Sequence, residues 1–130
     1  MTVFVDTNVL VRQLTGSPPE SAAASARLLA SGETLLLPDL ILAETIFVLQ
    51  SFYAMPRERV AELTRGVLAT GALQAEDPAV LFRAIEIYET YRLAFADAYL
   101  VASAEESGIG RIASFDRGID RVPTVERIEP

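Results

Sequence analysis

Four acidic residues lie at positions where a carboxylate could take part in chemistry: Asp6, Glu44, Asp97 and Asp116. Asp6 ends the apolar run 3–5, and Asp116 comes two residues after the run 111–114. Both runs have the composition of short strands, and α/β sheets present functional groups at the carboxyl ends of their strands. We therefore expect Asp6 and Asp116 at the functional edge of a sheet.

The other two acids share helix faces with apolar residues. Glu44 falls at spacings of three and four from apolar residues, namely Leu40, Ile41, Phe47 and Val48. Asp97 is placed in the same way among Leu100, Val101 and Ala104. The spacing predicts that both carboxylates lie on buried faces. A buried lone carboxylate is costly, so each needs an arginine, hydrogen-bond donors or a metal ion.

Each of these acids also has a purely structural interpretation. Asp6 could cap a helix that begins near Val9, and Asp97 could be a helix N-terminal acid favoured by the dipole. Glu44 could pair with an arginine, and Asp116 could hold a turn. Four other acids are assigned to helix caps and solvated faces, namely Asp39, Asp77, Glu105 and Glu106. The role of Asp120 is left ambiguous. Four separate structural explanations are harder to accept than one shared site.

The composition narrows the chemistry further. The chain has no cysteine and no histidine, which excludes disulfides, thiolate or imidazole ligands and the commonest general base. A carboxylate cluster without His or Cys favours hard divalent cations such as Mg²⁺ or Mn²⁺. All 11 basic residues are arginine, and the net charge of −7 argues against a generic nucleic-acid coat. Bound metal would reverse the local field where a phosphate lands.

Strands and helices are expected to alternate along the chain. The predicted strands are 3–5, 34–37, 73–75, 111–114 and 124–126. A first helix starts near Val9, and others are predicted over 19–30, 39–52, 56–71, 77–91 and 95–108, with Asp39 as an N-cap. The pattern predicts an α/β fold, a three-layer sandwich with a mainly parallel central sheet of roughly five strands. We see no glycine-rich phosphate loop.

Length and hydropathy indicate one soluble domain over residues 1–130. No apolar run approaches the ~20 residues that a membrane-spanning helix needs. The first residues lack a basic start and a small-residue cleavage site, so no secretory signal is expected. The expected location is cytoplasmic, with no membrane partner.

Taken together, the motifs resemble those of PIN-domain ribonucleases of the VapC toxin type. The resemblance covers essentially the whole chain and rests on Asp6-Thr7-Asn8-Val9, Leu42-Ala43-Glu44-Thr45, Phe95-Ala96-Asp97-Ala98-Tyr99-Leu100-Val101-Ala102 and Ser114-Phe115-Asp116. The set is specific, although Asp-Thr-Asn alone is not. Two departures are that Ser114 stands where the family often has threonine, and Gly118 where a polar residue is more usual.

The resemblance implies a metal-dependent endoribonuclease, the toxin of a type II toxin–antitoxin (VapBC) system. Asp6 and Asp97 would be the principal ligands of one or two Mg²⁺ or Mn²⁺ ions, and Glu44 and Asp116 would complete the site directly or through water. Hydroxyl and amide groups could orient these ligands, namely Thr7, Asn8 and Ser114. Three arginines could contact RNA phosphates, although each could equally be an ordinary solvated side chain: Arg12, Arg117 and Arg121.

The resemblance also implies a homodimer and a VapB-like antitoxin that lies across the site. Our candidate surface for this partner comprises the helices 19–30 and 39–52, with Phe47, Phe52 and Tyr53. Packing in the core is the alternative for these aromatic residues.

Three other functions compete with this interpretation. A phosphatase of the haloacid-dehalogenase type needs a second acid two residues after the first, where this chain has Asn8, and a lysine, which it lacks. A catalytically silent PIN-like scaffold that only binds RNA or protein is disfavoured by the retention of all four acids. A housekeeping RNA-processing nuclease would have the same site, and the genetic neighbourhood would separate it from a toxin.

Overall fold

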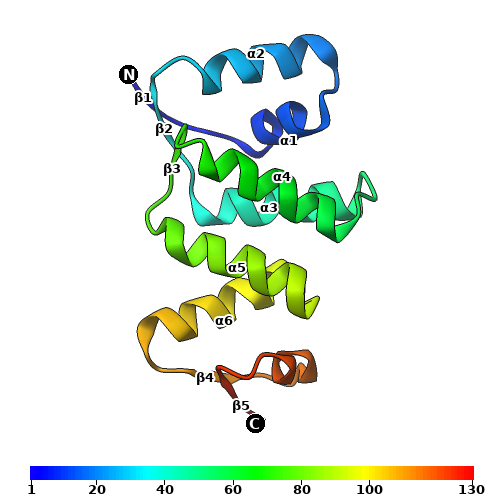
Figure 1. Ribbon diagram of the computed structural model, residues 1–130, viewed down its shortest axis with the longest axis vertical. Helices are drawn as coiled ribbons and strands as arrows, with labels where there is room; N and C mark the ends of the chain where they lie inside the picture. Colours follow the sequence, from blue (N-terminus) through cyan, green and yellow to red (C-terminus); the bar gives the residue numbers. More distant parts are fainter. The chain divides into compact units, whose positions relative to one another are not determined.

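The computed structural model describes all residues, 1–130, and contains six α-helices, one 3₁₀ helix and five short strands (Figure 1). Contacts within the chain divide it into two compact units, Met1–Pro78 and Ala79–Pro130. None of the helices combines the length and the apolar composition that crossing a bilayer requires.

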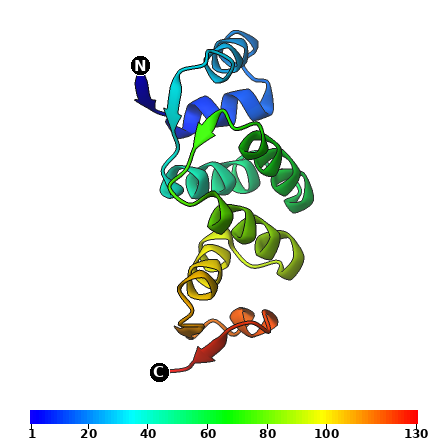
Figure 2. The ribbon, with the colours of Figure 1, turned by 60° about the vertical axis from the view of Figure 1, so that its left-hand side comes forward.

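The first unit is built on a three-stranded parallel sheet in the order β1-β2-β3 (Figure 2). Its strands are β1 (Thr2–Phe4), β2 (Thr34–Leu36) and β3 (Leu73–Gln74). The central strand places Leu35 opposite Val3 on one side and Leu73 on the other. Parallel neighbours need long crossover connections, and here each crossover consists of two helices.

The four helices of this unit fill those two crossovers. They are α1 (Thr7–Thr15), α2 (Pro19–Leu29), α3 (Asp39–Ser51) and α4 (Arg57–Ala69). Helix α1 packs against α2 and α3, and α3 packs against α4. Helix α1 ends at Gly16, whose left-handed backbone (φ 73°) suits glycine, and Pro19 is the first residue of α2.

The second unit contains α5 (Pro78–Tyr91), α6 (Phe95–Ser107), β4 (Arg111–Ala113), the 3₁₀ helix η1 (Arg117–Arg121) and β5 (Glu126–Ile128). Strands β4 and β5 are parallel, with Ile112 opposite Arg127. The rings of Tyr88 and Phe95 pack edge to face at 6.1 Å. Arg83 donates to both carboxylate oxygens of Glu105 at 2.8 and 2.9 Å, which ties α5 to α6.

Most of the predicted architecture is confirmed. The strands and helices alternate as expected, and all strand pairs are parallel, as in an α/β fold. The five strands form one sheet of three and another of two. The last strand is 126–128 and not 124–126, and η1 was not predicted, because a five-residue 3₁₀ helix has no periodicity to detect. A single domain over 1–130 stays a prediction.

The prediction for the buried face of α3 is wrong. The residues that α3 buries are Leu42, Thr45, Ile46 and Leu49, whereas Leu40 and Phe47 are 76% and 67% exposed. Glu44 is exposed with them. The physical reason is that α3 carries apolar residues around nearly its whole circumference, so spacing alone is compatible with more than one buried stripe.

The predicted N-cap of α3 is also corrected. Pro38 occupies the cap position and no side chain caps this end, while Asp39 is the first helical residue. A carboxylate in the first turn still interacts favourably with the helix dipole. Pro38 has the extended backbone of a cap residue, but proline has no side-chain acceptor, so the hydrogen bond that usually caps a helix is missing here.

Two leucines on α3 test which face of this helix is buried. Leu42→Ala is expected to lower the free energy of unfolding by about 2–5 kcal/mol, because the Leu42 side chain is fully buried. Leu40→Ala is the matched control, and its effect is expected to stay within about 0.5 kcal/mol. Urea unfolding followed by circular dichroism measures both. A larger loss for Leu40→Ala than for Leu42→Ala would contradict the assignment.

Candidate functional site

Asp6 lies at the junction of the first strand and the first helix. It follows Val5, whose backbone N–H still bonds to the Leu36 carbonyl beyond the end of β1. Its Oδ1 accepts a hydrogen bond of 2.7 Å from the N–H of Thr7, so Asp6 is the N-cap of α1. The structural role considered for Asp6 is therefore confirmed. The residue is also exposed, which leaves its second oxygen accessible to a ligand.

Thr7 connects Asp6 to the predicted acid on α3. The Thr7 side chain is buried, and its hydroxyl donates to Oε2 of Glu44 at 2.7 Å. Glu44 is thus held by a neutral hydroxyl and not by an arginine. These residues line a cavity of about 280 Å³, together with Asn8, Val11 and Val48. The first unit therefore brings Asp6 and Glu44 to the same cavity.

Asp97 and Asp116 meet in the second unit. Asp97 is half-buried in the first turn of α6, where no side chain caps the helix. The Asp116 carboxyl group lies close enough to act on Asp97. Burial raises the pKa of Asp97 above its usual range, and the hydrogen bond and the negative charge of Asp116 raise it further.

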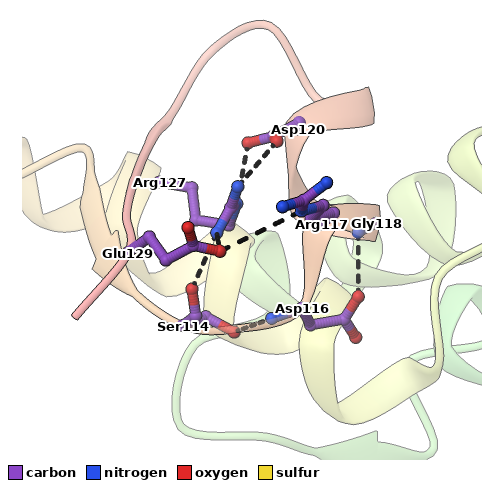
Figure 3. A network of polar contacts seen from close by, with 7 residues as sticks. All are labelled: Ser114, Asp116, Arg117, Gly118, Asp120, Arg127 and Glu129. Atoms are coloured by element: carbon purple, nitrogen blue, oxygen red, sulfur yellow. Dashed lines mark hydrogen bonds and ion pairs between the residues drawn. The ribbon is translucent and has the colours of Figure 1, made fainter.

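Asp116 is fixed by its own backbone neighbours. Its Oδ1 accepts from the Gly118 N–H at 2.8 Å, and its N–H donates to the Ser114 hydroxyl at 2.9 Å (Figure 3). A Cβ at position 118 would lie 3.0 Å from that Oδ1 and 3.3 Å from Cδ2 of Leu93. The departure from the family pattern at Gly118 thus makes room for the Asp116 carboxylate.

The predicted acids are brought together in pairs. Asp6 and Glu44 share a cavity in the first unit, and Asp97 and Asp116 are in contact in the second. No group of three or more acids that could hold a metal ion is formed. Mg²⁺ is commonly held by one or two carboxylates, with water and substrate phosphates as its other ligands. The all-oxygen donor set of each pair fits such an ion.

The three predicted phosphate contacts differ in what their guanidinium groups do. Arg12 is exposed and donates to the Ser21 hydroxyl at 3.3 Å. Arg117 is 80% exposed and lies 4.0 Å from a Glu129 oxygen. Arg121 donates to the Tyr91 and Arg92 carbonyls at 3.4 and 3.3 Å, so it closes the end of α5. Arg117 is the most available of the three.

One residue in this region was not found from the sequence. Arg127, on β5, has a side chain only 11% exposed and contacts Asp120, Ser114 and Glu129 (Figure 3). The last strand was predicted to begin two residues too early. The predicted bounds therefore did not show that the Arg127 side chain points to the opposite face of the strand from those of Glu126 and Ile128. An arginine between two strand residues, seven positions after an acid, was the available signal.

Two comparisons with known proteins bear on the family of this chain. The family model described as PIN domain matches residues 3–125. The chain belongs to the PIN-domain family. It is also similar to the VapC ribonuclease of Aquifex aeolicus (strain VF5), with 26% identity over 117 residues, which cover 88% of this chain and 87% of that protein. The resemblance to VapC-type PIN proteins is confirmed, and the matched range includes all four acids.

The Asp97–Asp116 contact predicts a specific titration. Replacing Asp116 with Asn removes the negative charge beside Asp97, so the pKa of Asp97 should fall but stay above its usual range, because burial remains. Carboxyl ¹³C chemical shifts, measured against pH in metal-free buffer, report this pKa. An unchanged Asp97 pKa in the variant would show that the two carboxylates do not interact.

The same contact makes the stability of the metal-free protein depend on pH. The folded chain holds the Asp97 proton more tightly than the unfolded chain, so this stabilisation is present below the ordinary aspartate pKa and is lost as pH rises through the raised value. Asp97→Asn should therefore be more stable than the wild type at neutral pH in EDTA and equally stable in acid. Urea unfolding at both pH values tests this, and a less stable variant at neutral pH would contradict it.

Proposed function

We propose that this chain is a metal-dependent endoribonuclease that hydrolyses RNA phosphodiester bonds with Asp6, Glu44, Asp97 and Asp116. The PIN-domain match and the VapC ribonuclease relative support a nuclease of this type. The observation that carries the proposal is that Asp116 lies close enough to Asp97 to raise its pKa, with no cationic side chain among the groups that act on Asp97.

A divalent cation would suit this pair of carboxylates. Two carboxylates in contact repel, and half-burial of Asp97 removes water that would otherwise screen them. Mg²⁺ and Mn²⁺ prefer hard oxygen ligands, and one such ion would offset both charges. We propose one or two ions at the four acids.

Neutral groups of the chain orient the proposed ligands. The Thr7 N–H and hydroxyl fix one oxygen each of Asp6 and Glu44, and the Gly118 N–H fixes one oxygen of Asp116. Each carboxylate keeps its other oxygen for an ion or a water molecule. When bound, a divalent ion would add positive charge at the scissile phosphate and make an attacking water more acidic. Asn8 and Ser114 complete the set of orienting groups.

The decisive experiment is cleavage of labelled transfer, ribosomal and messenger RNAs by the purified chain in Mg²⁺, Mn²⁺ or EDTA. Asp6→Asn is the sharpest variant, because asparagine caps a helix as well as aspartate but carries no charge. We expect cleavage only with metal, and a rate lowered at least ~100-fold in Asp6→Asn, as when one charge-stabilising group is lost. Glu20→Gln, an exposed acid on α2, is the control and should cleave normally.

No cleavage of any RNA by the folded wild-type chain, with or without metal, would favour the second candidate, a PIN-like scaffold that binds RNA or protein. Cleavage that survives EDTA would overturn the metal-dependent mechanism.

A toxin role and an antitoxin partner are part of the proposal. The candidate surface on α2 and α3 is supported by Phe47, Phe52 and Tyr53, which are 67%, 81% and 43% exposed and therefore do not pack in the core. Helix α2 also borders a largely apolar cavity of about 620 Å³ with α1 and α4. Large exposed apolar surfaces mark sites of protein contact. We propose a VapB-like antitoxin and a second copy of the chain as the partners.

Arg117 offers a test of phosphate contact. Each arginine that neutralises an RNA phosphate releases a counterion, so its loss should reduce the slope of log affinity against log salt by about 0.7–1. Arg117→Gln is expected to show this change in filter binding of uncleaved RNA in EDTA. Arg59→Gln, which removes an exposed arginine paired with Glu62, is the control. Equal slopes for Arg117→Gln and the wild type would remove Arg117 from the interface.

A further inference from the structure

One half-buried guanidinium group, that of Arg127, contacts both ends of the segment that carries Asp116. Nε and Nη2 of Arg127 contact Oδ1 and Oδ2 of Asp120 at 3.0 and 3.1 Å. Nη1 donates to the Ser114 carbonyl at 3.0 Å and to Oε1 of Glu129 at 3.2 Å (Figure 3). The Arg127 side chain is only 11% exposed, whereas its partners Asp120 and Glu129 are 54% and 49% exposed, so solvent still reaches the two ion pairs.

These contacts lie on either side of Asp116. Ser114 comes two residues before it, at the end of β4, and Asp120 comes four residues after it, in η1. Arg127 therefore joins the two ends of the segment 114–120. Within the segment, Asp116 forms hydrogen bonds with its own neighbours Ser114, Gly118 and Ile119.

We propose that Arg127 is a positioning residue that holds the two ends of the segment 114–120 together and thereby fixes the orientation of the Asp116 carboxylate. This inference rests on the proposed function, because it assigns a role toward the proposed metal site. Arg127 acts through its hydrogen bonds to Asp120 and to the Ser114 carbonyl, and it does not touch the site itself.

The segment needs such a clamp. A five-residue 3₁₀ helix is weak by itself, and the exposed Asp116 carboxylate has no side-chain donor to hold it. Arginine provides a rigid planar fork that contacts a carboxylate and a carbonyl together, whereas lysine offers a single flexible ammonium group. The Arg127 guanidinium thus fixes the two ends of the segment 114–120 with a planar geometry that lysine does not reproduce.

The role is one of geometry and not of charge toward Asp116. The positive charge of Arg127 faces two carboxylates, those of Asp120 and Glu129. Asp120→Asn should therefore resemble Arg127→Lys, although one variant removes a negative charge and the other keeps the positive one. A purely electrostatic role would give the two variants different effects.

The test measures Mn²⁺ affinity of the full chain by electron paramagnetic resonance, together with kcat and KM for RNA cleavage. Arg127→Lys and Asp120→Asn are each expected to weaken Mn²⁺ binding and to lower kcat about 10-fold, as for residues that orient metal ligands, with KM changed less than about twofold. The double variant should be no worse than either single variant, because both break the same clamp.

Arg83→Lys is the matched control. Arg83 makes an equivalent forked pair with Glu105 in the same unit, but at the end of α6 remote in sequence from Asp97. It is expected to lower the melting temperature while Mn²⁺ affinity and kcat stay at the wild-type values. Should Arg127→Ala fail to fold, Arg127→Lys and Asp120→Asn still carry the test.

Two outcomes overturn the inference in distinguishable ways. If Mn²⁺ binding is lost in Asp116→Asn but unchanged in Arg127→Lys and Asp120→Asn, Arg127 only stabilises the fold, and the proposed function stands. If the wild-type chain neither binds Mn²⁺ nor cleaves RNA, the proposed function fails and the positioning role fails with it.

Discussion

The acids proposed to form the site are held without any cationic side chain, which leaves their negative charge uncompensated. Neutral donors hold the acids proposed to form the site: a backbone N–H for Asp6 and Asp116, and a hydroxyl for Glu44. Neutral donors fix a carboxylate without cancelling its charge. Burial, together with the neighbouring Asp116 carboxyl group, raises the pKa of Asp97, and the uncompensated charge is what a divalent cation would bind.

Acids with a structural role are treated differently. Glu105 is paired with Arg83 and Asp120 with Arg127, and in both pairs the guanidinium lowers the carboxylate pKa. Arginine thus pairs with the acids that have a structural role and not with the acids proposed to form the site. Because the chain has no lysine, each ion pair of this kind has the planar guanidinium geometry, which can contact two acceptors at once.

The short strands contribute mainly by where they end. β1 delivers Asp6 to the start of α1, and β4 delivers Ser114 and Asp116 to the start of η1. Asp6 and Asp116 are also the N-cap residues of α1 and η1, so the hydrogen bond that caps each helix orients the acid. One interaction therefore serves both the fold and the site, which explains how strands of three residues can position functional groups.

The order of the elements, the parallel α/β class, the family resemblance and the four candidate acids follow from the sequence, because these depend on local composition and on motif spacing. The exposure of Glu44 beside Thr7 and the contacts of Arg127 with both ends of the segment around Asp116 depend on the three-dimensional fold. Helix α3 is apolar on nearly every side, so its buried face is chosen by the packing of α1 and α4. The Arg127 contacts join residues 7 and 13 positions apart, which no local pattern encodes.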